Sequence, residues 1–313
     1  MRTISKLIRS LVDLAPEDGV QEHPAAGLGI IRSSVATLPA PVLYRPTLCF
    51  VAQGAKEVKL DDRYIRYDAS NFLLGALDVP VLGAVVEASP DRPFLCVRMD
   101  LDLRMVAELV AQGPVQEEVH GAVHGEAPGA EGLTLGATTA ELVDAFARLV
   151  ALLKSPCDRE VLAPLVSREI VWRILASPSG DALRQICMAD SRLANIQRSI
   201  RLLGEEYRRS ITIEELAAAA GMSASSFHHH FKSVVGTTPV KYRAQLRLME
   251  AQRLMLVEGH DAARAGFAVG YASPSQFNRE YARLYGAPPA KDVARIREGA
   301  GSGHAAPQSE LMG

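Results

Sequence analysis

The chain has 313 residues, of which 48% are hydrophobic and 22% are charged, and its formal net charge is −2. This composition is typical of a globular protein, and the length allows two domains. The sequence has no apolar run of about 18 residues, which argues against a membrane span. Charges are scattered through the first nine residues, so these do not resemble a secretory signal.

The cysteines contain no Cys-x-x-Cys pair, which argues against a zinc ribbon and against a thioredoxin-like site. They are Cys49, Cys96, Cys157 and Cys187. Reduced thiols are the simplest interpretation, and they predict a cytoplasmic location.

Charge is distributed unevenly along the chain. Residues 192–300 carry 16 basic and 10 acidic side chains, whereas the remaining residues carry 18 basic and 26 acidic ones. A basic C-terminal third beside an acidic remainder favours a module that binds a polyanion. Solvated basic faces are common in proteins, so charge alone does not decide this.

The N-terminal half begins with a helical pattern and then changes to a β pattern. Apolar residues at helical spacing predict a short amphipathic helix within residues 1–20. From Gly27 to Asp102, short runs rich in Val, Leu and Ile alternate with turn signals. Many short strands at this spacing predict an all-β sandwich or barrel, at about residues 27–110.

Residues 113–136 are rich in Gly, Glu and His and are predicted to form a loop. Two helices are expected next, at about residues 138–154 and 159–176, within a helical region of about 138–178. One face of the first helix is apolar and carries Leu142, Phe146, Leu149 and Leu153. Such a pair of helices, packed beside a β domain, forms either a dimer interface or part of the core of one subunit, and both interpretations stay open.

A connector helix is expected at about residues 195–207, and the tail at 299–313 is expected to be disordered. Between them, two stretches fifty residues apart share one layout. The matched pairs are Ser223 and Ser273, Ser225 and Ser275, Phe227 and Phe277, Phe231 and Tyr281, Gly236 and Gly286, and Pro239 and Pro289. This is an internal duplication of one small helical unit. Two helix-turn-helix units in one chain can read two successive turns of a DNA major groove.

Signals for helix starts place the two units at about residues 212–236 and 261–286. These signals are Thr212 with Glu215, Ser223, Asp261, and Ser273 with Pro274. In each unit the second helix has an apolar stripe that is expected to face the core. The stripes consist of Phe227, Phe231 and Val234, and of Phe277, Tyr281 and Leu284.

If the stripes face inward, polar side chains on the opposite faces point toward DNA. The candidate DNA-binding residues are Ser225, His228, His229 and Lys232 in the first unit and Ser275, Gln276, Arg279 and Arg283 in the second. Arg forms bidentate hydrogen bonds to guanine and Gln forms them to adenine. Lys232 and Arg283 suit phosphate contacts.

The segment from Val240 to Val257 contains no Pro or Gly and is predicted to be one helix. At a rise of ~1.5 Å per residue it is about 27 Å long. A rod of this length can hold two recognition helices about one DNA turn, roughly 34 Å, apart. Its basic residues Lys241, Arg243 and Arg247 either contact phosphates or are solvated.

Three segments closely resemble the two-headed DNA-binding domain of AraC/XylS-type bacterial transcription regulators. They are Gly236–Arg247, Val269–Phe277 and Arg279–Gly286. Three further segments are similar to the N-terminal regulatory domain of one branch of that family, namely Leu43–Leu48, Gln53–Lys56 and Asp78–Val81. The resemblance implies a cupin-like barrel that binds an effector and often mediates dimerisation. One departure is the small-residue helix Ala262–Ala268, whose packing is expected to be looser.

Metal and enzyme hypotheses have little support. Consecutive residues on a helix point in different directions, so His228, His229 and His230 cannot chelate one ion together. Metal-dependent cupins use a His-x-His motif, whereas the N-terminal half has only His23, His120 and His124, none inside a predicted strand. No cofactor and no metal are therefore expected.

The strand segments between Thr47 and Met99 are expected to enclose a pocket for a small, largely uncharged effector. Cys49 lies in one of these apolar runs and is either a packed core thiol or a sensor that reacts with the effector. Thiol reactivity requires a lowered pKa and access. An electrophile such as an aldehyde is the effector that this second interpretation predicts.

Together these patterns predict an α+β fold. Residues 1–180 form a cupin-like β-barrel with flanking helices, and residues 192–298 form an all-α DNA-binding domain. The predicted function is effector-responsive, sequence-specific regulation of transcription without catalysis. The expected partners are double-stranded DNA, a small-molecule effector, a second copy of the chain and, for an activator, RNA polymerase, with no membrane. Two alternatives are a metal-independent or cryptic cupin enzyme fused to a DNA-binding domain, and a ligand-independent protein whose N-terminal domain only mediates association.

Overall fold

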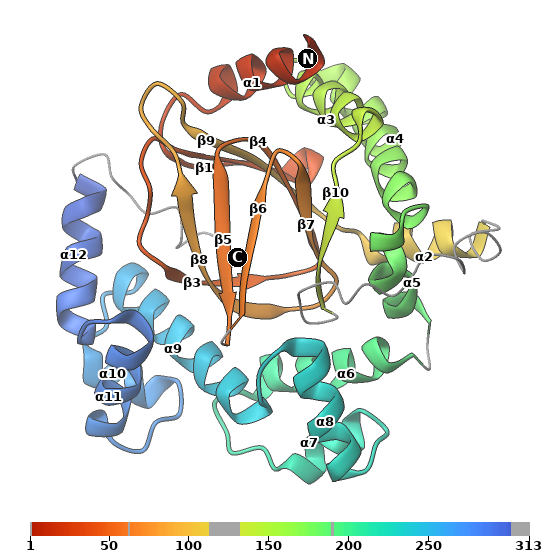
Figure 1. Ribbon diagram of the computed structural model, residues 1–313. Coiled ribbons are helices and arrows are strands. Elements are labelled where there is room, and N and C mark those ends of the chain that lie inside the picture. The colour runs from red at the N-terminus through yellow and green to blue at the C-terminus, as the bar shows by residue number, and fades with distance from the viewer. Residues whose placement is uncertain (1, 62, 113–131, 189–190, 302–313) are drawn as a thin grey trace.

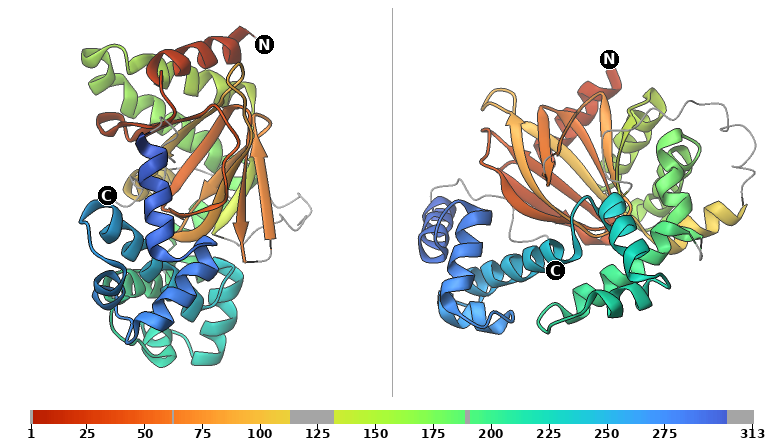
Figure 2. Two further views of the ribbon diagram at one scale, coloured as in Figure 1. Left: turned by 90° about the vertical axis from the view of Figure 1, so that its left-hand side faces the viewer. Right: turned by 60° about the horizontal axis from the view of Figure 1, so that its bottom comes forward.

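The protein was analysed as a computed structural model, which describes residues 2–61, 63–112, 132–188 and 191–301 (Figure 1). The N-terminal half contains two antiparallel sheets with helices along one side, and the C-terminal half is helical. Figure 2 shows the C-terminal helices gathered against one end of the sheets.

The larger sheet has six strands in the order β1-β2-β9-β4-β7-β10, and the smaller has four in the order β3-β8-β5-β6. The bounds of the first set are β1 Gly19–His23, β2 Leu28–Ser33, β9 Phe94–Asp100, β4 Thr47–Gln53, β7 Asn71–Gly75 and β10 Leu133–Ala137. Those of the second are β3 Ala40–Tyr44, β8 Val79–Glu87, β5 Ala55–Leu60 and β6 Arg63–Asp68. Every described pairing is antiparallel.

The two sheets face each other as an open sandwich. No backbone pairing joins them among the described strands, so the expected closed barrel is wrong in this detail. The expected mixed α+β fold is confirmed. The expected loop at residues 113–136 is also partly wrong, because Leu133–Ala137 pairs with β7 as strand β10. Alternating Leu and small residues let this short segment add an edge strand, while residues 113–131 lie outside the described part.

The helices of this half are α1 Arg2–Leu14, α2 Leu103–Gln112, α3 Ala140–Leu152, α4 Pro156–Leu175 and α5 Asp181–Cys187, with 3-10 turns at Pro24–Ala26 and Pro178–Gly180. Helices α1, α3 and α4 lie together along one side of the sheets (Figure 1). The apolar face of α3 is buried inside the chain, and Phe146 stacks on Phe50 of β4 with ring centroids 4.5 Å apart. This face of α3 is therefore buried within one subunit.

The C-terminal half has helices α6 Arg192–Glu206, α7 Ile213–Ala219, α8 Ala224–Val235, α9 Pro239–Val257, α10 Ala262–Ala268, α11 Pro274–Tyr285 and α12 Pro289–Gly301. The predicted connector and the long linker helix are confirmed as α6 and α9. Helices α7 and α8 form the first head, and helices α10 and α11 form the second, at opposite ends of α9 (Figure 1). The tail after residue 301 lies outside the described residues.

The two heads differ in whether their apolar core is continuous with the core of the N-terminal half. One apolar cluster runs from the sheets through α6 into the first head and includes Ile196, Phe227 and Tyr242. The second head has a separate cluster that includes Leu254 and Phe277. The first head is therefore packed as part of the N-terminal half, whereas the second is an independent packing unit.

Candidate DNA interface and effector pocket

The recognition helix of the first head, α8, begins and ends where the sequence predicts. The Ser223 hydroxyl accepts a hydrogen bond from the backbone N–H of Ser226 at 3.3 Å. Gly236 ends the helix in the left-handed conformation, with φ 78°, which a glycine adopts without steric cost. Phe227, Phe231 and Val234 are buried, so the predicted stripe faces the core.

The recognition helix of the second head, α11, repeats this design. The Ser273 hydroxyl accepts from the backbone N–H of Gln276 at 3.2 Å, and Gly286 ends the helix with φ 73°. Phe277 and Tyr281 are buried, while Leu284 is half-buried against the same cluster.

All eight candidate DNA-binding side chains are exposed. Ser225, His228, His229 and Lys232 lie on α8, and Ser275, Gln276, Arg279 and Arg283 lie on α11. They occupy the faces opposite the buried stripes, as predicted from the helical period. Within the second set, the Gln276 amide donates to Glu280 Oε1 at 3.1 Å, which orients that side chain in the free protein.

The basic residues of α9 hold parts of the chain together. Arg247 donates to the backbone carbonyls of Tyr207 at 2.7 Å and Arg208 at 2.8 Å, at the C-terminal end of α6. This arrangement neutralises the negative end of the α6 dipole, so Arg247 has a structural role. Lys241 is exposed and pairs with Asp61 at 2.9 Å.

The first head meets the turn between β5 and β6. Asp61 of this turn and Arg63, the first residue of β6, line a hollow together with His228, His229 and Lys232 of α8. Beside it, the Tyr242 hydroxyl donates to the backbone carbonyl of Asp78 at 3.1 Å. The candidate DNA-binding face of the first head therefore faces the N-terminal half.

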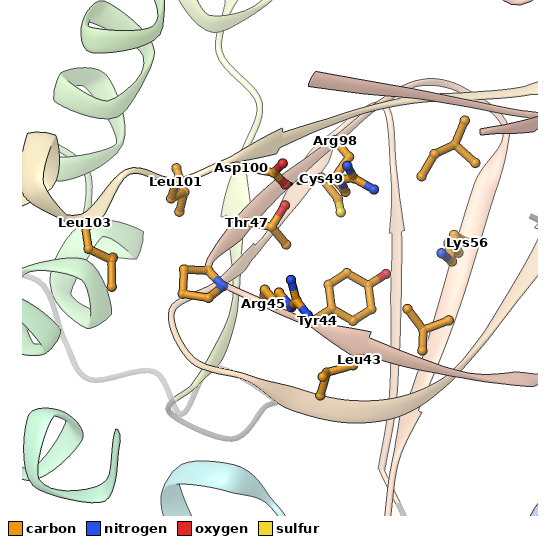
Figure 3. A pocket seen from close by; sticks show the side chains of 13 residues that line it. Leu43, Tyr44, Arg45, Thr47, Cys49, Lys56, Arg98, Asp100, Leu101 and Leu103 are labelled. Carbon is orange, nitrogen blue, oxygen red and sulfur yellow. Dashed lines mark hydrogen bonds and ion pairs between the residues drawn. The ribbon is translucent and has the colours of Figure 1, made fainter. Parts of the chain in front are cut away.

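A pocket of about 380 Å³ opens between the two sheets (Figure 3). Its lining residues come from β2, β3, β4, β5, β9 and the segments that follow β3 and β9. They are Ile31, Val42, Leu43, Tyr44, Arg45, Pro46, Thr47, Cys49, Lys56, Arg98, Asp100, Leu101 and Leu103. The pocket overlaps the predicted range between Thr47 and Met99 only at Thr47, Cys49, Lys56 and Arg98, and its other lining residues lie outside that range. The expectation that few charged groups line the pocket is wrong, because cationic and anionic side chains lie along its wall.

Two cations and two phenols surround the buried thiol of Cys49. The Lys56 ammonium lies 5.7 Å from the ring centroid of Tyr44, whose hydroxyl is 2.8 Å from that of Tyr67. Arg98 is held by Glu22 at 2.8 Å and by Asp100 at 3.2 Å. A hydrogen bond with the Cys96 thiol lowers the pKa of Cys49, and Lys56 and Arg98 lower it further against the opposing effect of burial.

Two protein families match this chain. The N-terminal region of AraC-type transcriptional regulators matches residues 24–182, and a helix-turn-helix domain family matches residues 216–295. The chain belongs to the AraC-type transcriptional regulators. The second match agrees with the two helix-turn-helix heads, and together the two matches confirm the resemblance seen in the sequence.

Several regulators are similar in sequence. The transcriptional activator NphR of Rhodococcus sp is 26% identical over 256 residues, which cover 80% of this chain and 70% of NphR. RclR of Escherichia coli K12, an RCS-specific transcriptional activator, is 34% identical over 105 residues, which cover 34% of this chain and 36% of RclR. The chain thus spans about a third of the length of RclR, and similarly 32% and 38% of two further regulators.

Solved structures of ToxT from Vibrio cholerae share the fold of both halves. One has a TM-score of 0.54 and 11% identity and covers 88% of this chain and 98% of ToxT. Another, with a TM-score of 0.51, is ToxT with an unsaturated fatty acid bound.

The part of the chain that the structure describes presents no cluster typical of a metal site. Among the described residues, no group of three or more His, Cys, Asp or Glu side chains could hold an ion. His23 is the last residue of β1, which corrects the expectation that no N-terminal histidine lies in a strand. His120 and His124 lie outside the described residues. None of the described helices is long and apolar enough to span a membrane.

Sequence reasoning missed Arg98 and Asp61. Arg98 faces the pocket because it lies opposite Cys49 in the β4–β9 register, a pairing that no local pattern shows. Asp61 is detectable only as part of a turn signal, and its contact with Lys241 joins residues 180 positions apart.

Proposed function

We propose that this AraC-type regulator binds specific double-stranded DNA through both heads and responds to a small molecule in the pocket between its sheets. The observation that carries the DNA-binding role is the pair of capped recognition helices, whose polar faces are exposed above buried aromatic stripes. The two heads lie at opposite ends of one stiff helix, as successive major-groove contacts require.

The full-length protein is expected to select a specific duplex from a random pool. Two heads that make about 6–10 phosphate contacts should lose roughly 10³–10⁵-fold in affinity between about 50 and about 200 mM salt, because bound counterions are released. Titration of the selected duplex by fluorescence anisotropy at several salt concentrations measures this slope. Failure to enrich any sequence, or a salt-independent affinity, would contradict the proposal.

The pocket and the first head are connected by strand β5. Lys56 of β5 lines the pocket, and Asp61, directly after the end of β5, pairs with Lys241 beside the first head. A molecule that shifts β5 thus acts on the contact that the first head makes with the N-terminal half. The fatty acid bound in ToxT supports a small-molecule effector for this fold.

We propose Cys49 as the effector-binding residue that reacts with an electrophile such as an aldehyde, because its sulfur faces the pocket near Lys56 and Arg98. Cys49→Ala and Cys49→Ser are each expected to abolish the response of a reporter fused to the selected operator. Cys157→Ser, at an exposed cysteine, is the control and should respond as the parent does. If both Cys49 variants respond to every active compound as the parent does, the thiol only packs.

We further propose a homodimer that forms through α4. This helix exposes three large apolar side chains on one face, Val161 at 67%, Leu165 at 60% and Trp172 at 39%. Leu165→Glu is expected to shift a dimer to monomer in analytical ultracentrifugation, because it places a charge in an apolar contact. Leu38→Glu, at a residue 71% exposed on another surface, is the matched control. A parent that sediments as a monomer at all accessible concentrations would rule the dimer out.

The remaining assignments follow from this role. We propose that the regulator acts in the cytoplasm, where its DNA partner is present, and performs no catalysis of its own. RNA polymerase is a further proposed partner if the regulator activates transcription.

A further inference from the structure

A second cysteine, Cys96, lies on the strand next to that of Cys49. Strands β4 and β9 are antiparallel neighbours in which Cys49 lies opposite Arg98 and Val51 lies opposite Cys96. Because side chains alternate between the faces of a strand, Cys49 and Cys96 share one face as a diagonal pair. Each thiol shifts the pKa of the other, and the two shifts have opposite directions.

The two thiols differ in access. Cys49 lines the pocket of about 380 Å³, whereas Cys96 is buried and does not line it. In Figure 3 the Cys49 sulfur lies beside Arg98 and points toward Tyr44. A small reagent that enters between the sheets therefore reaches Cys49 first and has Cys96 directly behind it.

Charge also distinguishes the two thiols. The interaction between the two thiols lowers the pKa of Cys49 and raises that of Cys96. Lys56 and Arg98 both stabilise a thiolate at Cys49. The thiolate is the nucleophilic form of cysteine, so Cys49 is the attacking member of the pair.

We infer that Cys49 and Cys96 form a redox-active pair, in which a hydroperoxide that enters the pocket oxidises Cys49 and Cys96 converts the product into a disulfide. This deepens the proposed function, because it rests on the same pocket and names a class of signal. It requires neither DNA binding nor a dimer.

The chemistry takes two steps. The Cys49 thiolate attacks one peroxide oxygen, the O–O bond breaks, and the hydroxide that leaves takes up the proton lost by the thiol, which gives a sulfenic acid and water. The Cys96 sulfur then attacks the Cys49 sulfur, the S–O bond breaks, and the hydroxide and the Cys96 proton form a second water. Two thiols are oxidised to one disulfide, and one hydrogen peroxide is reduced to two waters.

The bond would change the shape of the pocket. Diagonal pairs on neighbouring strands have Cα atoms about 7–8 Å apart, whereas disulfides prefer roughly 5.5–6 Å. Closing the disulfide therefore draws β4 and β9 together at the wall that carries Arg98. Oxidation and a bound effector would thus act on the same pocket.

The test uses reduced, full-length protein treated with hydrogen peroxide, quenched in acid, unfolded, alkylated and mapped by peptide mass spectrometry. The expected product is a Cys49–Cys96 linked peptide that lacks two hydrogens. Exposed Cys157 is the internal comparator and should be consumed several-fold more slowly than Cys49, because Lys56 and Arg98 favour the thiolate of Cys49. Oxidation of Cys157 while Cys49 and Cys96 stay reduced, or linkage of Cys49 to any other cysteine, would overturn the inference.

Two variants test the order of the steps. Cys96→Ser should stop at a Cys49 sulfenic acid that dimedone traps, and Cys49→Ser should leave Cys96 reduced. If Cys49→Ser loses the Cys96 thiol as fast as the parent, or if dimedone labels nothing in Cys96→Ser, the assigned roles are wrong. The parent peptide map decides the main point even if a variant fails to fold.

Operator binding by the reduced parent, measured on the same sample, separates this inference from the proposed function. DNA binding without a disulfide contradicts only the inference, and a disulfide without DNA binding contradicts only the proposed function.

Discussion

Phe277→Ala is expected to destabilise the second head by about 3–5 kcal/mol, because it removes a buried ring and leaves a cavity in a small core. Phe277 is fully buried and contacts Tyr271 and Tyr281, with ring centroids 5.4 and 5.5 Å away. Because this cluster is separate from the main core, the loss should be confined to the second head. Hydrogen exchange by mass spectrometry should show α10 and α11 exchanging quickly while the sheets stay protected.

Phe267→Ala is the matched control in the same head. Phe267 lies on α10 and is 56% exposed, so its removal should cost little. If Phe277→Ala leaves exchange in α11 unchanged, or if the sheets lose protection together with α11, then the two cores are not independent as described.

The small residues of α10 explain why this core is sensitive. A Cβ atom at Gly266 would lie 2.9 Å from Cγ of Phe277, closer than ordinary contact. Sequence reasoning expected looser packing in this helix. The structure shows the opposite, because the missing side chain lets the α10 backbone approach the ring of Phe277.

The duplication has diverged in its cores. Phe231 in the first head packs edge-on against Tyr242, with ring centroids 5.7 Å apart. At the positions fifty residues later, the Tyr281 hydroxyl donates to the buried carboxylate of Asp292 at 2.9 Å. Tyr242, on α9 beside the first head, donates its hydroxyl hydrogen bond to the N-terminal half, whereas Asp292, on α12, accepts from Tyr281 of the second head. The main apolar cluster accordingly includes Tyr242, and the core of the second head forms a separate cluster.

Local patterns predicted the helical half well. The caps at Thr212, Ser223 and Ser273 are hydrogen bonds to the backbone three residues further along the chain. The apolar stripes follow the helical period, so both signals lie within one short segment of the sequence. The N-terminal half was predicted less completely. Whether two sheets close into a barrel, and which side chains meet across them, depends on pairings between distant strands. Cys49 was identified as a candidate, but its neighbour Cys96 lies 47 positions away in the chain.

The contacts between the N-terminal and C-terminal halves also could not be predicted from local sequence patterns. The ion pair of Asp61 with Lys241 and the bond from Tyr242 to Asp78 join segments that share no sequence signal. Lys241 was considered only as a phosphate contact or a solvated charge. A third role, an ion pair with the N-terminal half, can be recognised only when the positions of both halves in the fold are known.

Arg279→Ala is expected to cost about 1–3 kcal/mol on the selected duplex and to relax the base preference at one position, as for the loss of a bidentate guanine contact. Arg279 is exposed on the outer face of α11, opposite the buried Phe277 and Tyr281. Lys232→Ala should instead weaken selected and random duplexes alike and reduce the salt slope by about one, as for a phosphate contact.

Arg279→Lys is the decisive companion variant. It keeps the positive charge but loses the planar fork that binds two guanine acceptors, so the salt slope should persist while the base preference is lost. Arg104→Ala, at an exposed arginine in the N-terminal half, should bind as the parent does. Affinities for the selected duplex, its single-base variants and random DNA separate these outcomes. If Arg279→Ala and Lys232→Ala lose the same factor on selected and random DNA, then α11 contacts only the phosphate backbone at this position and base readout lies elsewhere on the helix.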